Sequence, residues 1–278
     1  MMKLPVGMKA PVSRSLFVAA LLVAVATICL AVPLSTPATA GKRPLRIVLD
    51  PGHGGENMGA VGPYGVHEKH ITMILANKVA DMFKDNPDVV IFFTRRDDSF
   101  VSLRDRAAMA NAVGADMLLS IHCNASTNRG ANGIETFFVG PGSDDSTREL
   151  AGRENGEEAL PEAADRDRSL NLLLADMAFN GTVNESALLA EEIQKSLMAS
   201  LPGARDRKVR QAPFTVLQEA RVPAIVIETG FITHETEGRQ LLMSGHQDTI
   251  ARAIHEGVLN FIASLDEMPA FARQYDLE

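Results

Sequence analysis

The sequence has little cysteine, and its acidic residues outnumber its basic ones. It contains two cysteines, Cys29 and Cys123, in 278 residues, and the first lies in a segment that we expect to be removed. An internal disulfide is therefore excluded for the rest of the chain. The formal net charge of −8 argues against nucleic acid as a partner, because phosphate binding requires an excess of basic side chains. The absence of an internal repeat of solenoid length excludes repeat architectures.

The first 40 residues have the features of a secretory signal peptide. Basic residues precede Leu16, an apolar run follows, and small residues occupy positions 38–40. This order predicts cleavage after Ala40. The apolar run is nearly long enough to cross a membrane, so a retained anchor is the alternative. We expect a signal peptide at residues 1–40, no stable membrane span after cleavage, and one catalytic domain at residues 41–278.

Short apolar runs rich in β-branched residues recur through the remaining chain. They lie at residues 45–50, 89–94, 117–122 and 224–228. Because they do not alternate with polar residues, they predict strands buried on both faces. Segments with helical spacing lie between them, at 71–82 and 103–113. This alternation predicts an α/β fold with a single domain, a mostly parallel or mixed central sheet of about six strands, and helices on both faces.

Three further segments complete the expected fold. Residues 133–140 predict an edge strand, and residues 214–220 predict a shorter strand. Residues 248–265 have the amphipathic spacing of a C-terminal helix. We expect most of these segments to form core and to carry no chemistry themselves.

Three of the predicted buried strands lead directly to an ionisable residue. The first is followed by a glycine-rich loop that carries His53, the third ends at His122, and a later one ends at Glu228. Open sheets of this class bind ligands beyond the carboxyl ends of their strands. A single histidine in such a place is usually structural, but three such ends indicate a site. A metal ion would compensate the cost of burying these groups.

A third metal ligand is expected at the start of the first long helix. The sequence GVHEKH offers His67, Glu68 and His70. Glu68 is equally well explained as a carboxylate that the helix dipole favours, whereas the two histidines, like Glu56, are better explained as solvated. Two histidines and one carboxylate, with a fourth position open to water, are a common catalytic zinc set.

Six motifs follow one another in a specific order. They are LDPGHGGENMGAVGPYGVHEKHITM, FTRRDD, SLRDRAAMAN, ADMLLSIHCNAS, GIETFFV and PAIVIETGFIT. Together they resemble the zinc-dependent N-acetylmuramoyl-L-alanine amidases of the type-3 amidase family. The resemblance extends from about Leu45 to Leu265.

The resemblance implies a role for each of four residues. In this family the metal is held by a His in the GHGG loop, a Glu before Lys and a His after Ser-Ile, which are His53, Glu68 and His122 here. The family's catalytic glutamate ends the late strand, at Glu228. The implied cofactor is one zinc ion per chain, and the implied substrate is the amide between N-acetylmuramic acid and L-alanine in peptidoglycan.

Some positions depart from the usual family pattern. Asn57 stands where an Asp is usual, and His234 stands where an Asn is usual; neither belongs to the implied metal set. Asn124 is close to His122 in the sequence and either supports the metal ligands or contacts substrate. Other recurrent family positions, which we interpret as structural polar links, are Arg95, Arg106 and Asn111.

The implied chemistry is zinc-assisted hydrolysis of an amide. Zinc polarises the carbonyl and activates water, while Glu228 takes the proton of the water and returns it to the leaving amine. One alternative is another zinc peptidase that acts on wall peptides with the same residues. A second alternative is a catalytically silent peptidoglycan-binding protein, which would need neither Glu68 nor Glu228.

An insertion at about residues 143–182 predicts a regulatory element. Its first half is highly charged and contains Glu154, Glu157 and Glu158, and its second half has leucines at helical spacing. The alternative is a solvated surface segment with one docked helix. The sequence RELAGREN resembles the start of a helical insertion that covers the zinc in division-associated members and that a LytM-type activator displaces. We therefore expect an autoinhibited periplasmic enzyme of septal wall splitting or remodelling, with one of the three glutamates on the zinc.

Overall fold

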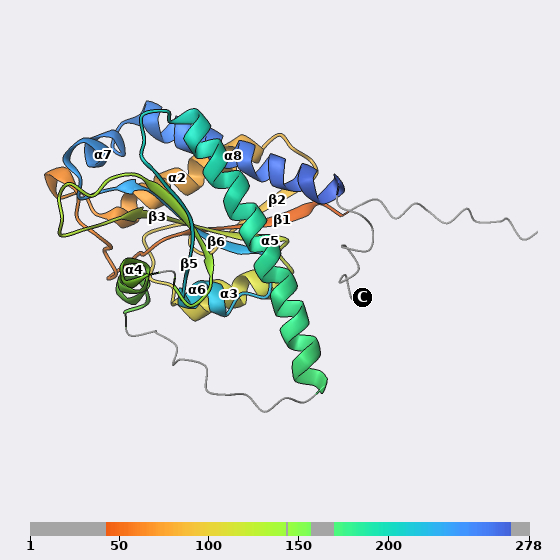
Figure 1. Cartoon of the computed structure of the whole chain (residues 1–278). Helices are drawn as coiled ribbons and strands as arrows, with labels where there is room; N and C mark the ends of the chain where they lie inside the picture. Colours follow the sequence, from red (N-terminus) through yellow and green to blue (C-terminus); the bar gives the residue numbers. More distant parts are fainter. Residues whose placement is uncertain (1–42, 143, 157–169, 268–278) are drawn as a thin grey trace, which may run out of the picture. The chain divides into compact units, whose positions relative to one another are not determined.

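The computed structural model describes residues 43–142, 144–156 and 170–267 (Figure 1). The predicted signal peptide at residues 1–40 lies outside the described residues, as do Glu157 and Glu158 of the predicted insertion. Among the described residues, no helix has both the length and the apolar character that crossing a membrane requires.

A six-stranded sheet in the order β2-β1-β3-β6-β4-β5 forms the centre of the fold. Its strands are β1 (Leu45–Pro51), β2 (Val89–Phe93), β3 (Met117–Asn124), β4 (Ile134–Val139), β5 (Asp206–Ala212) and β6 (Ala224–Phe231). Neighbouring strands are parallel except for β4 and β6, which are antiparallel. The predicted α/β class with a mostly parallel sheet of about six strands is confirmed.

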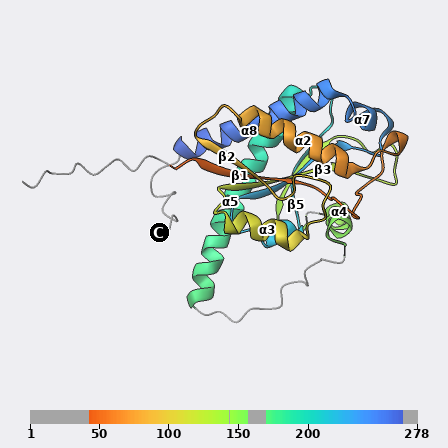
Figure 2. The same cartoon turned by 180° about the vertical axis from the view of Figure 1, so that it is seen from behind.

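Helices cover both faces of this sheet (Figures 1 and 2). One face packs against α2 (Glu68–Phe83), α5 (Leu170–Ser200) and α8 (Ser244–Glu267). The other face packs against α3 (Leu103–Ala112), α4 (Asp145–Asn155) and α6 (Thr215–Gln218). The short helices η1 (Pro63–Gly65) and α7 (Glu235–Gln240) lie in connecting segments. The helices predicted from residues 71–82, 103–113 and 248–265 correspond to α2, α3 and α8.

The two middle strands, β3 and β6, are buried along their whole length. In β3, Leu119 and Ile121 face the core beneath α2, α5 and α8, whereas Leu118 faces the core beneath α3, α4 and α6. Successive side chains of a strand point to opposite faces of the sheet. Because both faces are covered, both need apolar residues, which explains why these runs do not alternate with polar residues.

The structure corrects two predicted strands and adds one. The predicted edge strand at 133–140 is β4, which lies inside the sheet between β6 and β5. Residues 214–220, predicted as a strand, contain the helix α6, because a short apolar run has no period that separates a strand from one helical turn. The actual edge strand is β5, and its charged sequence DRKVRQA gives no buried-strand pattern, as is common for edge strands.

The predicted insertion contains α4 and the beginning of α5. A capping box starts α4: the Asp144 carboxylate accepts a hydrogen bond from the Thr147 backbone N–H at 3.0 Å, and the Thr147 hydroxyl accepts one from the Asp144 N–H at 3.2 Å. Leu150 and Ala151 bury one side of α4 in the core beneath α3, α4 and α6. The described part of the charged half, residues 144–156, therefore forms a helix that a narrow apolar stripe docks on the sheet.

A buried ion pair fixes the end of β1, from which the glycine-rich loop leaves the sheet. The Asp50 carboxylate accepts hydrogen bonds from Arg106 Nη1 at 2.7 Å and from Ser120 Oγ at 2.6 Å. Arg106 also donates to the backbone oxygens of Pro51 and His53, at 2.8 Å and 2.7 Å. The pair thus anchors the backbone of His53 to α3.

Asp50→Asn is expected to lower the free energy of unfolding by about 3–5 kcal/mol, because it leaves the buried Arg106 charge without its partner. Burial alone would raise the pKa of Asp50, but Arg106, together with the hydroxyl groups of Ser120 and Thr94, holds this pKa below its usual value. The stabilisation is therefore complete above the unfolded pKa of about 3.9 and is lost as the pH falls through the lower folded pKa.

Denaturant unfolding of the parent and of Asp50→Asn, at pH values from neutral to acidic, checks this expectation. The exposed Asp81, on α2, supplies the control Asp81→Asn, which should unfold like the parent. Equal stability of the parent and Asp50→Asn at neutral pH would show that the pair contributes nothing.

Candidate functional site

Three neighbouring strands place three ionisable side chains side by side on one face of the sheet. His122 of β3 is the register partner of Glu228 of β6, which is also the register partner of Glu135 of β4. All three residues are buried. In each strand, an even number of positions separates this residue from an apolar residue that packs in the core beneath α3, α4 and α6. Because successive side chains of a strand alternate between the two faces, all three side chains point to the face that this core covers.

Glycines bring the loop after β1 close to the two histidine rings. A Cβ atom at Gly52 would lie 2.4 Å from His122 Cε1, and one at Gly59 would lie 2.6 Å from His53 Cδ2. Gly59 also has a φ of 67°, a backbone conformation that glycine adopts without strain. The loop lacks side chains at these points because the imidazoles occupy the space.

Asn57 orients the His53 ring. Its Oδ1 accepts a hydrogen bond from the Gly59 backbone N–H at 3.2 Å and lies 2.9 Å from His53 Nδ1. Because a backbone N–H can only donate, the oxygen and not the nitrogen of the amide faces both groups. His53 Nδ1 therefore carries a proton, and in the neutral ring Nε2, which faces Glu68 and Glu154, is the nitrogen that can bind a ligand.

Glu68 is held in place by the backbone at the start of α2. Its Oε1 accepts from the Cys123 N–H at 2.9 Å, and its Oε2 accepts from the Ala60 N–H at 3.0 Å. The side chain is 1% exposed. Two backbone donors favour the ionised carboxylate, so a charged group is fixed in a buried position between two histidines.

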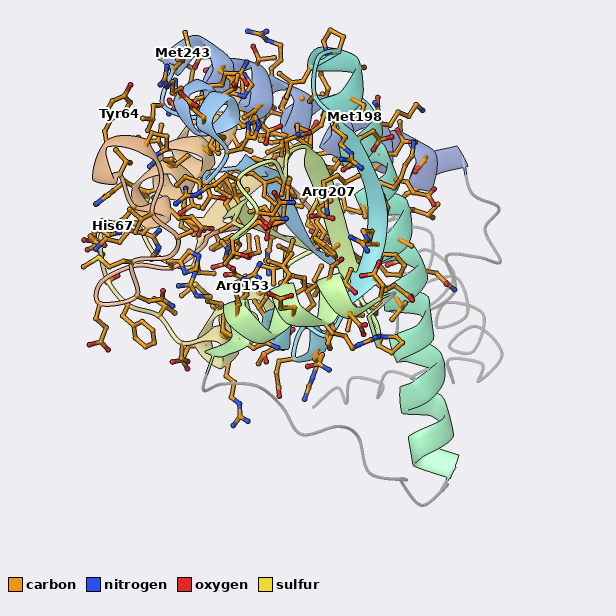
Figure 3. The ribbon with its side chains drawn as sticks, turned by 60° about the vertical axis from the view of Figure 1, so that its left-hand side comes forward. Tyr64, His67, Arg153, Met198, Arg207 and Met243 are labelled. Carbon is orange, nitrogen blue, oxygen red and sulfur yellow. The ribbon has the colours of Figure 1, made fainter. Side chains whose placement is uncertain are left out.

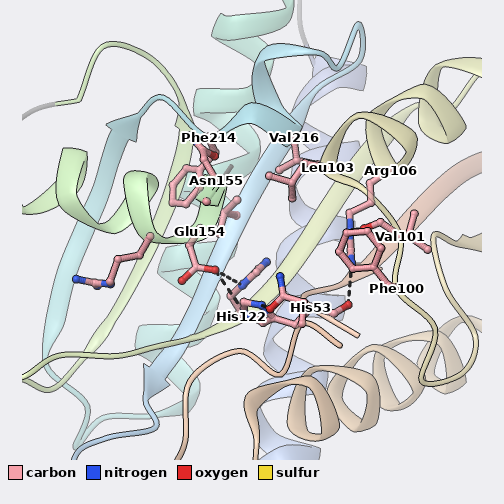
Figure 4. Close-up of a pocket in the computed structure, with 14 residues that line it drawn as sticks. His53, Phe100, Val101, Leu103, Arg106, His122, Glu154, Asn155, Phe214 and Val216 are labelled. Carbon is pink, nitrogen blue, oxygen red and sulfur yellow. Dashed lines mark hydrogen bonds and ion pairs between the residues drawn. The ribbon is translucent and has the colours of Figure 1, made fainter. Parts of the chain in front are cut away.

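Four side chains meet beneath α4, and Figure 4 shows three of them, His53, His122 and Glu154. Glu68 Oε2 lies 2.9 Å from His53 Nε2, and Glu68 Oε1 lies 3.1 Å from His122 Nδ1. Glu154 Oε2, from α4, lies 3.3 Å from His53 Nε2 and 3.4 Å from His122 Nδ1. A tetrahedral zinc ion with bonds of about 2.0–2.1 Å has ligand atoms about 3.3 Å apart, and these spacings are close to that value.

The donor atoms also have the character that a metal requires. His53 Nε2 and Glu154 Oε2 are buried and make no hydrogen bond. Suitable donor atoms of His53, His122 and Glu154 all lie within 4.8 Å of one another, and Glu68 contacts both histidines. Imidazole nitrogens with carboxylate oxygens suit zinc, so the residues fit that ion.

The profile of the N-acetylmuramoyl-L-alanine amidase family matches residues 47–260. The chain belongs to this family. It is 35% identical over 232 residues to N-acetylmuramoyl-L-alanine amidase AmiA of Escherichia coli K12, covering 82% of this chain and 80% of that protein.

Solved structures agree with this assignment of the amidase. The N-acetylmuramoyl-L-alanine amidase from Clostridium difficile 630 has a TM-score of 0.62 and 30% identity, with coverage of 80% of this chain and 98% of that one. AmiC2 of Nostoc punctiforme has a TM-score of 0.59 and 27% identity, with coverage of 79% and 97%. The family resemblance predicted from the motifs is confirmed.

The charges of the amidase site stabilise one another. Burial alone would lower the pKa values of His53 and His122, but the carboxylates of Glu68 and Glu154 raise the pKa of His53 above its ordinary value and that of His122 well above it. Burial would raise the pKa of Glu68, but the histidines hold it well below its usual value. Each group shifts toward its charged form because opposite charge is close. A bound metal ion would supply that positive charge in place of the histidine protons.

Glu228 differs from the other carboxylates of the amidase. It is fully buried, and neither of its oxygens makes a hydrogen bond. Burial raises its pKa well above the usual range; His122 opposes this shift, and Glu154 and Glu68 add to it. A carboxyl group with a raised pKa binds a proton more readily than an ordinary glutamate, which is a property of carboxyl groups that act as general bases and acids.

A cavity of about 260 Å³ lies beside these residues and under α4. His53, His122 and Glu154 line its polar side, and apolar side chains such as Phe100 and Phe214 line the other. The amidase therefore has room for an organic group next to the converging ligands.

The structure separates the remaining predicted residues into two groups. His70 and Glu56 are exposed, and His67 is partly buried, so none of them joins the cluster. The residues interpreted as polar links donate to backbone oxygens: Arg95 to Pro51 and Gly52, Arg106 to Val101, Pro51 and His53, and Asn111 to Glu219. They position loops of the amidase without contacting the cluster through their side chains.

Sequence reasoning missed Glu135 and its partners. Asn124 donates to Glu135 Oε1 at 2.6 Å rather than to a metal ligand. Arg207 and Arg210 of β5 also contact the Glu135 carboxylate. Glu135 stands inside the quoted motif GIETFFV as a single acid in an apolar strand, and that buried charge is the signal that could have identified it.

Proposed function

We propose that the amidase hydrolyses the amide between N-acetylmuramic acid and L-alanine in peptidoglycan with one zinc ion held by His53, Glu68 and His122. The observation that supports the metal set is that the Glu68 carboxylate lies between the two histidines, 2.9 Å from His53 Nε2 and 3.1 Å from His122 Nδ1, and these spacings are close to those of a tetrahedral site. When bound there, zinc polarises the carbonyl of the amide that is cleaved.

The residues of the chain supply the remaining steps. Glu228, buried beside His122 and without a hydrogen-bond partner, accepts a proton from the attacking water and returns it to the departing L-alanine amine. Asn57 holds His53 in the tautomer that leaves Nε2 free. Asn124 holds Glu135 and so shapes the side of the site beyond Glu228.

Turnover on purified peptidoglycan, together with metal analysis, tests this function. An amidase releases whole stem peptides that carry a free L-alanine amine. A different zinc peptidase would release fragments cut within the stem, and a silent binding protein would release nothing. Either of the last two results would contradict the proposal.

We also propose that α4 inhibits the amidase by filling the fourth ligand position. Glu154 Oε2 contacts both histidines, which is where water must bind for hydrolysis. Asn155 fastens the same end of α4 to a loop, because its amide donates to the Pro213 oxygen at 2.8 Å and accepts from the Thr215 N–H at 2.8 Å. Opening of this helix would then expose the site.

Glu154→Ala is expected to raise basal hydrolysis of purified peptidoglycan about tenfold, the population change that loss of roughly 1.4 kcal/mol of helix docking would give. The physical reason is that the helix loses its contact with the two histidines. Hydrolysis is measured without any partner protein.

Glu149→Ala is the matched control, since Glu149 lies on the same helix, is exposed, and pairs only with Arg153 in the described contacts. It should behave like the parent. An unchanged rate for Glu154→Ala, in a folded protein that still binds zinc, would mean that α4 is a structural element and no inhibitor.

We further propose secretion through the signal at residues 1–40 and action in the periplasm during septal wall splitting or remodelling. The motif order and the docked α4 support a LytM-type activator as the partner that displaces the helix. Addition of such an activator should raise hydrolysis by the parent and leave Glu154→Ala little changed.

A further inference from the structure

Two arginines of the edge strand β5 converge on one buried carboxylate. Arg207 Nε lies 3.0 Å and Arg210 Nη1 lies 3.1 Å from the oxygens of Glu135. Arg207 is also held over the ring of Phe231, with its Cζ 5.1 Å from the ring centroid. Figure 3 shows Arg207 on this strand, beside the helix α4 that carries Arg153.

One carboxylate balances only one of the two guanidinium charges, which leaves a positive charge that can bind a second anion. In the structure α4 supplies it: Arg210 Nη2 pairs with the Asp144 carboxylate and lies 3.4 Å from Ser146 Oγ. Asp144 is half-exposed, whereas Glu135 is fully buried. Glu135 is thus a permanent partner of the arginines, and Asp144 is a partner that leaves if α4 moves.

The helix α4 therefore presents a carboxylate to the site at each of its ends. Asp144 contacts Arg210, and Glu154, ten residues later, contacts His53 and His122. Ten residues of helix span about 15 Å. The strands β3, β6, β4 and β5 are consecutive in the sheet, and Arg210 is the register partner of Phe137, two residues beyond Glu135. Three strand spacings, about 14 Å, and this offset along the strand, about 7 Å, place the backbones of His122 and Arg210 about 16 Å apart.

Because the length of α4 is close to the separation of His122 and Arg210, a substrate that replaces α4 can reach both. An extended peptide advances about 3.3–3.6 Å per residue, so three residues, together with the reach of an arginine side chain, cover the distance from the cleaved amide to Arg210. The row of register partners that leads across the sheet from the metal cluster toward Arg210 consists of His122, Glu228 and Glu135.

We propose that Arg210, once α4 is displaced, binds a carboxylate on the third residue of the stem peptide, and that Asp144 occupies this anion position in the closed state. The inference rests on the proposed function, because it requires a stem peptide at the site. Arg207 and Glu135 hold the Arg210 guanidinium in place. Arginine suits this role because its planar fork binds carboxylates through two parallel hydrogen bonds.

The test compares two muropeptides with three-residue stems that differ only in a free carboxylate or a carboxamide at the third residue. It uses the Asp144→Ser background, because serine keeps the helix cap but removes the pair with Arg210. In this background kcat/KM for the acid should exceed that for the amide about tenfold, as one partly buried charge-assisted contact supplies. When Arg210→Gln is added, this ratio should fall to about one, mainly because KM for the acid rises.

Two controls keep the result interpretable. Lys208→Gln removes a positive charge from the same strand at an exposed position and should preserve the ratio. A second pair of muropeptides differs only at the second stem residue. The ratio of their kcat/KM values should be the same for Asp144→Ser with and without Arg210→Gln. Because the ratio compares two substrates with one protein sample, it does not change when part of a variant fails to fold.

A preference for the acid that survives Arg210→Gln would overturn the inference, as would equal rates for both muropeptides in Asp144→Ser. In these cases the muropeptides are still cleaved, so the proposed function stands. If no muropeptide is cleaved by the parent or any variant, the proposed function fails and the inference fails with it.

Discussion

Glu228→Gln is expected to retain zinc and to lose about 10²–10⁴-fold in turnover, the usual contribution of a general base. The amide is isosteric with the carboxyl group but cannot accept a proton from water. The side-chain oxygens of Glu228 have no hydrogen-bond partner among the described residues, so the substitution removes no described side-chain hydrogen bond. Turnover on purified peptidoglycan and zinc content per chain are the two measurements.

A control variant and the zinc content decide whether Glu228 is the general base. Glu56→Gln changes an exposed carboxylate on the loop that carries His53 and should leave turnover unchanged. Near-normal turnover of Glu228→Gln would rule out this residue as the base. Loss of zinc in the same variant would instead make Glu228 part of the metal set.

His122→Ala is expected to weaken zinc binding at least 100-fold, since loss of even an outer-shell partner of a ligand costs 10–100-fold. Activity should fall together with metal content. The ring of His122 contacts Glu68 and Glu154, so its removal opens the cluster on the side of β3. Competition with a chromogenic chelator measures the affinity without relying on turnover.

His70→Ala is the control for this experiment. His70 lies two residues after Glu68 on α2 but is exposed, so the variant should bind zinc like the parent. If His122→Ala also binds zinc like the parent, the set of His53, Glu68 and His122 is wrong.

The fold class could be predicted because the middle strands are buried on both faces. Runs such as MLLSIH and AIVIE contain few polar residues, and their β-branched side chains distinguish them from the helical segments between them. The polar exceptions His122 and Glu228 were recognisable for the same reason, since an ionisable residue at the end of a buried strand must have a partner. The family resemblance then selected Glu68 from among its neighbours in GVHEKH.

The edges of the sheet could not be predicted in the same way. The strand β5 is half-exposed and charged, so its sequence resembles a surface segment. The strand β4 enters between β6 and β5 in the antiparallel direction, and no local pattern encodes that position. Strand order depends on which elements cover each face after the chain has folded.

The sequence by itself determined the α/β class, the family, and the order of His53, Glu68, His122 and Glu228 along the chain, because motifs and buried strands are local patterns. Only the tertiary structure showed that a glutamate of the insertion, Glu154, meets the histidines. It brings Glu154 to them through the docking of α4. It also decided that Glu135 lies beside Glu228 and within reach of Arg210, since strand pairing here joins residues about 90 and about 70 positions apart in the chain. Contacts between distant segments arise from the register of the sheet, and that register is set by packing on both of its faces.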